Sequence, residues 1–146
     1  MTIKALRGEN VYNTLQAITA VTSLCELFSM KPDEDATPVW NYAWATITSD
    51  IPWVYSNVGH IMKSARVSFH IVCRKELWST DTPERVLWAI VDAISNAIVS
   101  QWSQKVYSVD GLYIQSITED TVSPIFFQDS RHLVIKDYIF NYLSVG

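Results

Sequence analysis

The chain has 146 residues, which is enough for one hydrophobic core and too few for two ordinary domains. Its composition, 49% apolar and 18% charged, is that of a globular protein and excludes a disordered chain. The net charge is −4 and the Lys and Arg residues are scattered, whereas a dedicated nucleic-acid binder needs clustered cations to neutralise phosphates. We therefore expect a single domain that spans residues 1–146.

The cysteines and the absence of apolar targeting segments indicate the compartment. The first seven residues lack the apolar core of a secretory signal, and no stretch approaches the ~18 apolar residues of a membrane span. Cys25 and Cys73 each lie in an apolar stretch, which favours two buried free thiols over a disulfide. We expect a soluble protein that folds in a reducing cytosol and has no membrane partner.

The first element in chain order is a predicted helix. From Asn10 to Phe28, apolar residues recur at steps of three and four, with Asn10 as the expected N-cap. Pro32 and the acidic run at 33–35 should end it.

An aromatic segment follows. Residues 38–48 are short, rich in aromatic and β-branched side chains, and bounded by prolines, which favours a strand over the competing amphipathic helix. In a strand, Trp40, Tyr42 and Trp44 share one face. Residues 50–63 contain Pro52 and a glycine and predict a loop or mobile hairpin.

The middle of the chain has the clearest patterns. Residues 64–74 alternate between apolar and more polar side chains, which predicts a strand with one buried face. Thr82 and Pro83 then predict a helix N-cap and first turn. The helix should run to about Ser100. Its expected core face comprises Leu87, Ile90, Val91, Ile94, Ala97 and Ile98.

The remainder predicts β-structure. Residues 106–109 lead into the turn pair Asp110-Gly111, and 112–118 form the return strand. An acidic connection containing Pro124 precedes a long final strand at 132–143. Both faces of that strand are apolar, so both should be covered, and one cover could be a second subunit.

The sequence contains no catalytic or metal-binding signature. His60, His70 and His132 are far apart, and the glycines build no phosphate loop. The acidic runs at 33–35 and 119–120 fall in expected loops, where such charges usually only interact with solvent. Cys73 ends an apolar strand face, a poor setting for a nucleophile. We expect no enzyme activity, no cofactor and no metal.

The aromatic residues allow two interpretations. They can pack in the core and loops, or several can be exposed in the monomer and buried between subunits, where aromatic anchors dominate binding energy. The candidate subunit-interface residues are Trp40, Tyr42, Trp44, Trp53, Tyr55, Tyr138, Phe140 and Tyr142.

The order of the expected elements resembles the tail-terminator, or tail-completion, family of long-tailed bacteriophages. The similar segments are a Pro-initiated aromatic strand at 38–42, an alternating strand at 65–71, a helix at 84–94 and a closing hairpin at 111–116 with 132–138. The chain departs from the family in its aromatic richness and in the long segment at 49–63.

The resemblance implies an α+β fold in which one mostly antiparallel β-sheet is packed by two α-helices. It also implies a non-enzymatic virion protein, assembled in the host cytoplasm, that caps the tail tube as a homo-oligomeric ring, commonly of six subunits. Its partners would be other copies of itself, the tail-tube protein and a neck or head-completion protein, with DNA only as passing cargo. A negatively charged lumen would not trap the genome.

Two alternatives remain open. One is a neck protein, a head-tail connector or another minor tail protein. The other, from a different class, is a small-ligand or metal-dependent enzyme whose site is assembled from separated residues. A large apolar pocket with converging polar groups would favour the enzyme, whereas exposed aromatic strips would favour assembly.

Overall fold

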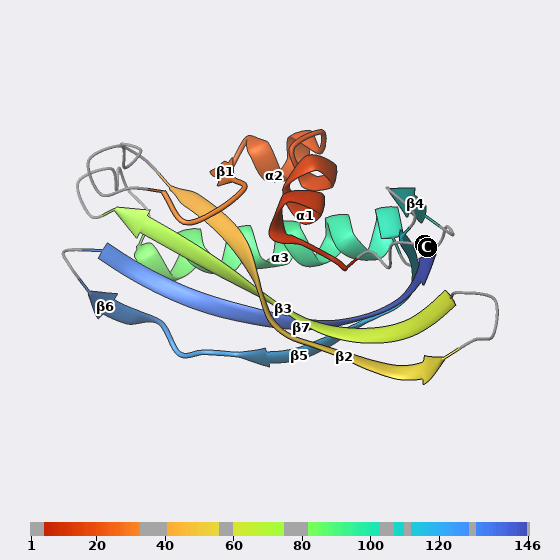
Figure 1. The fold of residues 1–146 in the computed structure, drawn as a ribbon. Coiled ribbons are helices and arrows are strands. Elements are labelled where there is room, and N and C mark those ends of the chain that lie inside the picture. Colours follow the sequence, from red (N-terminus) through yellow and green to blue (C-terminus); the bar gives the residue numbers. More distant parts are fainter. Residues whose placement is uncertain are drawn as a thin grey trace.

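A mixed sheet forms one layer of the protein, and helices form the other (Figure 1). The computed structural model describes residues 5–32, 41–55, 60–74, 82–102, 107–109, 112–128 and 131–145. Within these ranges the chain forms both β-strands and α-helices, which confirms the expected α+β class. The strands are β1 (Glu26–Phe28), β2 (Tyr42–Tyr55), β3 (His60–Arg74), β4 (Tyr107–Val109), β5 (Leu112–Val122), β6 (Phe126–Gln128) and β7 (Arg131–Val145).

The sheet is mostly antiparallel, as expected. Six of its seven strands have the order β1-β2-β3-β7-β5-β4. The seventh strand, β6, pairs with the start of β7, on the same side of β7 as β5. β3 and β7 are central and pair along their whole lengths, from His60 opposite Val145 to Arg74 opposite Arg131. Only β1 is parallel to its neighbour, β2.

The helices lie over one face of the sheet, which we call the inner face (Figure 1). They are α1 (Gly8–Leu15), α2 (Thr19–Thr22) and α3 (Pro83–Trp102). α3 confirms the predicted helix, because its expected core side chains are all buried. Its predicted cap is also present, since the backbone N–H of Arg85 donates to Thr82 Oγ1 at 3.4 Å. We call the opposite side of the sheet, over which no described helix lies, the outer face.

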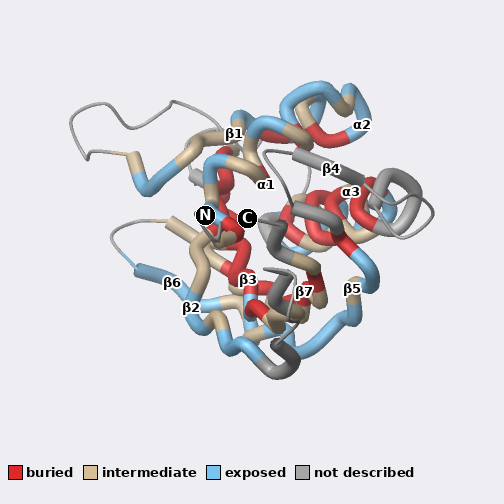
Figure 2. The backbone as a smooth tube through the Cα atoms, turned by 45° about the vertical axis from the view of Figure 1, so that its right-hand side comes forward, coloured by how far each residue is buried: buried red, intermediate tan, exposed pale blue. Residues whose placement is uncertain are grey.

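The main core fills the space between α3 and the inner face (Figure 2). The alternation predicted for β3 is confirmed, because its five inward side chains are at most 1% exposed. The neighbouring strand, β7, contributes Val134, Tyr138, Phe140 and Tyr142 to the same core. Cys25 and Cys73 are buried there as free thiols, as predicted.

The prediction of one helix over residues 10–28 is wrong. α1 ends at Leu15, α2 is a single short helix, and β1 then pairs with β2 through the Glu26 N–H and the Asn41 carbonyl at 2.9 Å. Ile18 has extended backbone angles and interrupts the helical run. The segment is rich in β-branched residues, whose helix propensity is weak, so burial of Val21 and Cys25 and the β1–β2 pairing outweigh its helical periodicity.

For residues 50–63, where the sequence predicts a loop or a mobile hairpin, the described residues form a hairpin and not a loop. β2 and β3 extend through this segment as a long hairpin, with Asp50 opposite Ala65 and Pro52 opposite Lys63. Pro52 is tolerated because β1 pairs only with Tyr42–Trp44, which leaves this part of β2 as an edge in the described structure. On the other side of β2, the pairing with β3 has a register shift between Pro52 and Val54, which accommodates the proline.

Two further differences concern β5 and β6. Glu119 and Asp120, expected in a loop, lie within β5, which continues to Val122 with a register shift beyond Glu119. β6 was not expected from the sequence. It follows Pro124 and pairs with the start of β7, placing Phe126 opposite Leu133.

A candidate interaction groove on the outer face

A second apolar cluster lies on the outer face, away from the main core. It consists of buried Tyr42, Trp44 and Val72, with Phe28 and Leu133 packed against them. Register explains the arrangement, because Tyr42 lies opposite Val72, which lies opposite Leu133. The expectation that Tyr42 and Trp44 share a strand face is met here.

The rings of this cluster form a stack that continues onto β3. The Tyr42 and Trp44 ring centroids are 6.0 Å apart with planes at 17°, and the Trp44 and His70 centroids are 4.9 Å apart with planes at 5°. Trp44 and His70 are cross-strand partners, which brings their rings together. The His70 Nε2 atom lies 3.1 Å from Thr46 Oγ1, which gives the ring a polar partner.

A groove of about 390 Å³ lies over this stack. Its volume falls in the range of sites that hold a small ligand or a short chain segment. It extends across β2, β3, β7 and β6 and includes residues that follow β1. The lining residues are Lys31, Pro32, Tyr42, Trp44, Thr46, His70, Val72, Phe126, Gln128, Arg131, Leu133 and Ile135.

The groove has cationic groups and no acidic lining residue among those described. Arg131 Nη1 donates to the Tyr42 hydroxyl at 2.7 Å, and the guanidinium carbon lies 6.0 Å from the centroid of the Tyr42 ring. Lys31 is exposed. The pKa of His70 lies below its ordinary value, mainly because burial disfavours the charged ring, while Asp137 opposes this shift. His70 is therefore neutral at pH 7, and the groove favours an anionic or acidic occupant.

The outer face becomes polar beyond the groove. The Arg66 guanidinium pairs with Asp120 at 2.9 Å, and the Thr121 hydroxyl donates to Asp137 Oδ2 at 2.9 Å. Asp137 Oδ1 is buried and has no hydrogen-bond partner within the described ranges. The apolar groove and this polar region divide the outer face into two chemically distinct halves.

A polar cluster on the inner face includes a serine, but its geometry is structural. Ser95 Oγ hydrogen-bonds the Tyr138 hydroxyl and donates to Glu119 Oε1 at 3.1 Å, and Lys136 Nζ lies 3.5 Å from the same Glu119 oxygen. Burial, as the largest cause, raises the pKa of Tyr138 to about 12, so its phenol stays protonated and cannot serve as a base at neutral pH. The cluster ties α3 to β5 and β7.

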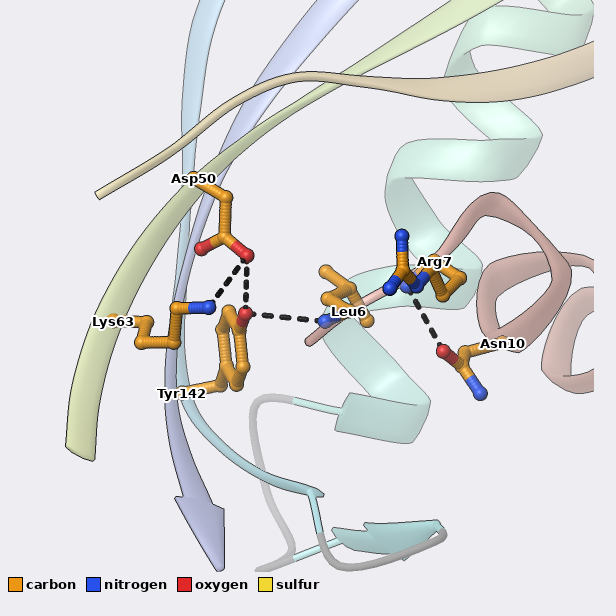
Figure 3. Close-up of polar contacts among 6 residues, drawn as sticks. All are labelled: Leu6, Arg7, Asn10, Asp50, Lys63 and Tyr142. Atoms are coloured by element: carbon orange, nitrogen blue, oxygen red, sulfur yellow. Dashed lines mark hydrogen bonds and ion pairs between the residues drawn. The ribbon is translucent and has the colours of Figure 1, made fainter. Parts of the chain in front are cut away.

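A second polar cluster on the inner face surrounds Tyr142, four residues further along β7 than Tyr138 (Figure 3). The Tyr142 hydroxyl donates to Asp50 Oδ2 at 2.7 Å and accepts from the Leu6 backbone N–H at 3.1 Å. Lys63 Nζ pairs with the same Asp50 oxygen at 3.0 Å. These contacts join the N-terminal segment to β2, β3 and β7.

The candidate interface residues fall into three groups. Tyr138, Phe140 and Tyr142 are at most 1% exposed within the chain, so they are core side chains and leave no surface for a partner. α3 and the N-terminal segment cover this face of the final strand, so no second subunit is needed there. Tyr42 and Trp44 line the groove.

The third group lies outside the described side chains. Trp40 is not among the described residues, and Trp53 and Tyr55 are described only as backbone in β2. Sequence reasoning missed Lys31, Phe126 and Arg131 as groove residues. The Phe126-Phe127 pair, two residues after Pro124, was a usable signal, since adjacent large apolar residues in a polar connection need a cover.

Neither protein-family models nor curated proteins match this chain. Within the described ranges, no group of three or more His, Cys, Asp or Glu residues is placed to hold a metal ion. The helices described here lack the combination of length and apolar character that crossing a membrane requires.

Proposed function

We propose that this chain is a structural virion protein that closes the end of a phage tail tube as a ring of identical subunits and joins it to the neck. The observation that carries the proposal is the uneven covering of the sheet. The helices lie over the inner face, while the outer face holds an aromatic groove with exposed apolar side chains at its margin. Such a surface is typical of a protein contact.

The strand edges also bear on how copies associate. β2 beyond Trp44 and β5 beyond Ile114 have no strand on their outer side among the described residues. Both strands have irregular register, and β2 contains Pro52, features that discourage pairing with another edge. The proposal therefore places the subunit contact on side chains rather than on a continuous sheet.

The test is to locate the chain in virions. Gold-labelled antibody against the chain should mark the head-proximal end of the tail tube, and particles made without the chain should contain tails that are not joined to heads. Label on the neck above the tube would favour the connector alternative. Virions that contain no copy of the chain would exclude both.

A second candidate function is binding of a small ligand, either as a binding protein or as an enzyme. The groove itself supports it, because an apolar site of about 390 Å³ with Arg131, Lys31 and Gln128 around it could hold an apolar carboxylate. Calorimetric titration with 4-phenylbutyrate and with its neutral amide tests this. Saturable binding of the acid that is lost in Arg131→Gln would support it, and no binding of either would exclude this ligand class.

A further inference from the structure

The groove has a counterpart elsewhere on the same chain. Residues 118–122 of β5, which we call the acidic strip, contain Glu119 and Asp120 and end at Val122. The Glu119 side chain is 59% exposed and Val122 is 42% exposed. Glu119 and Val122 lie on the inner-face side of the strip, in register with Tyr138 and Lys136, whereas Asp120 pairs with Arg66 on the outer face, so the strip presents one carboxylate on each side of the strand.

The margin of the groove presents the complementary groups. Phe126 is 36% exposed and lines the groove together with Lys31 and Arg131, and Met30, which precedes Lys31 in the chain, is 71% exposed. The groove therefore carries cations and the acidic strip carries carboxylates, and each of the two surfaces also has an exposed apolar side chain. The strip is extended, and β4 pairs only with Leu112–Ile114, so within the described structure no strand covers its outer edge.

We propose that the groove of one copy binds the acidic strip of a second copy. This inference rests on the proposed ring and names the contact that builds it. Groove and strip are different parts of the chain, so the contact is heterologous and repeats from copy to copy until it closes. Copies with a net charge of −4 repel each other, and a contact that places cations of the groove against carboxylates of the strip offsets this repulsion.

The intrachain partner of Asp120 leaves this carboxylate available, because its pair with Arg66 at 2.9 Å has side chains that are 26% and 46% exposed, and such a surface pair exchanges partners at little cost. Glu119 pairs at 3.5 Å with Lys136, which is only 10% exposed, so that pair is costlier to break and Asp120 is the more available carboxylate. Tyr42 accepts a hydrogen bond from Arg131 Nη1, and a guanidinium has five N–H donors. Arg131 can therefore hold Tyr42 and receive a carboxylate at the same time.

A charge-swap experiment tests the contact. Sedimentation of the full chain from micromolar to millimolar concentration should show wild-type self-association. Arg131→Glu in the groove and Asp120→Lys in the strip should each weaken it at least tenfold. Mixing the two variants should restore it, because each groove then meets a strip of opposite charge. The double variant in one chain should also associate.

Two further variants control for folding and for net charge. Lys31→Glu alters an exposed groove residue, so it tests the same charge if Arg131→Glu does not fold. Arg85→Glu changes the net charge equally on the exposed face of α3 and should leave association unchanged.

The outcomes separate this contact from the ring itself. Association that is insensitive to both reversals, or that mixing fails to restore, overturns the contact while the ring can still form through another surface. A wild-type chain that is monomeric at every concentration also overturns the contact, and antibody labelling of virions then decides the ring separately. Binding of 4-phenylbutyrate that leaves association unchanged assigns the groove to a small ligand and overturns the contact.

Discussion

The Tyr142 hydroxyl lies 2.7 Å from Asp50 Oδ2 and 3.1 Å from the Leu6 backbone nitrogen, so one phenol joins three distant parts of the chain (Figure 3). Tyr142 is fully buried, and burial raises the pKa of its phenol well above the usual range. The hydroxyl therefore acts as a neutral donor and acceptor that no solvent molecule readily replaces.

Tyr142→Phe should lower the free energy of unfolding by about 1–3 kcal/mol, because the Leu6 N–H and Asp50 both lose a buried partner. A urea titration followed by circular dichroism measures this. Tyr12→Phe removes a hydroxyl from a half-buried tyrosine of α1 and should cost much less. Equal losses in the two variants would show that the Tyr142 contacts do not stabilise the fold.

Ile94→Ala should cost about 2–5 kcal/mol of unfolding free energy, because Ile94 is fully buried between α3 and the sheet and its truncation leaves a cavity. Asn96, two residues along the same helix, is exposed, and Asn96→Ala should cost little. Denaturant titrations of the two variants side by side give the comparison. Similar losses would mean that the buried face of α3 is assigned incorrectly.

Stability should fall at alkaline pH because of Tyr138. Its folded-state pKa is about 12 against an ordinary value of 10, so the folded state favours the protonated phenol. The resulting stability is complete below pH 10 and is lost as pH rises towards 12, by about 2–3 kcal/mol in all. Unfolding free energies measured from pH 9 to 11.5 should decline less steeply in Tyr138→Phe than in wild type. Identical slopes would refute this role.

Neither thiol should react in the folded protein. Cys25 and Cys73 are buried and free, and burial raises the pKa of Cys25 to about 12, which removes the reactive thiolate at neutral pH. Titration with a disulfide reagent should therefore release almost no chromophore from native protein and two equivalents from protein unfolded in guanidinium. Rapid native labelling would contradict the burial, and fewer than two equivalents after unfolding would indicate a disulfide.

We predict that the β2–β3 hairpin, which carries the candidate interface residues Trp53 and Tyr55, helps to seal the contact between subunits of the ring. We expect Trp53, whose side chain lies outside the described residues, to be accessible in the free subunit and buried in the assembled particle, because large aromatic residues in a hairpin tip need a cover. Iodide quenching of a variant in which Trp53 is the remaining tryptophan compares the two states. Equal quenching in both would place the seal elsewhere.

Local pattern was sufficient for the elements whose periodicity is strong. The alternation at 64–74 and the Pro83-initiated apolar stripe identified β3 and α3 with their buried faces, because period and facing are properties of a segment alone. The aromatic segment at 38–48 identified the start of β2, and its two-residue period put Tyr42 and Trp44 together.

Only the tertiary structure decided the rest, because it depended on partners distant in sequence. Residues 10–28 have helical periodicity, yet pairing with the start of β2 turned their end into β1. The groove brings together Lys31, Trp44, His70, Phe126 and Arg131 from separate segments through strand order and register, which no local window encodes. Which aromatic residues are core and which border a groove was decided in the same way, since a strand's period assigns a face but not what covers it.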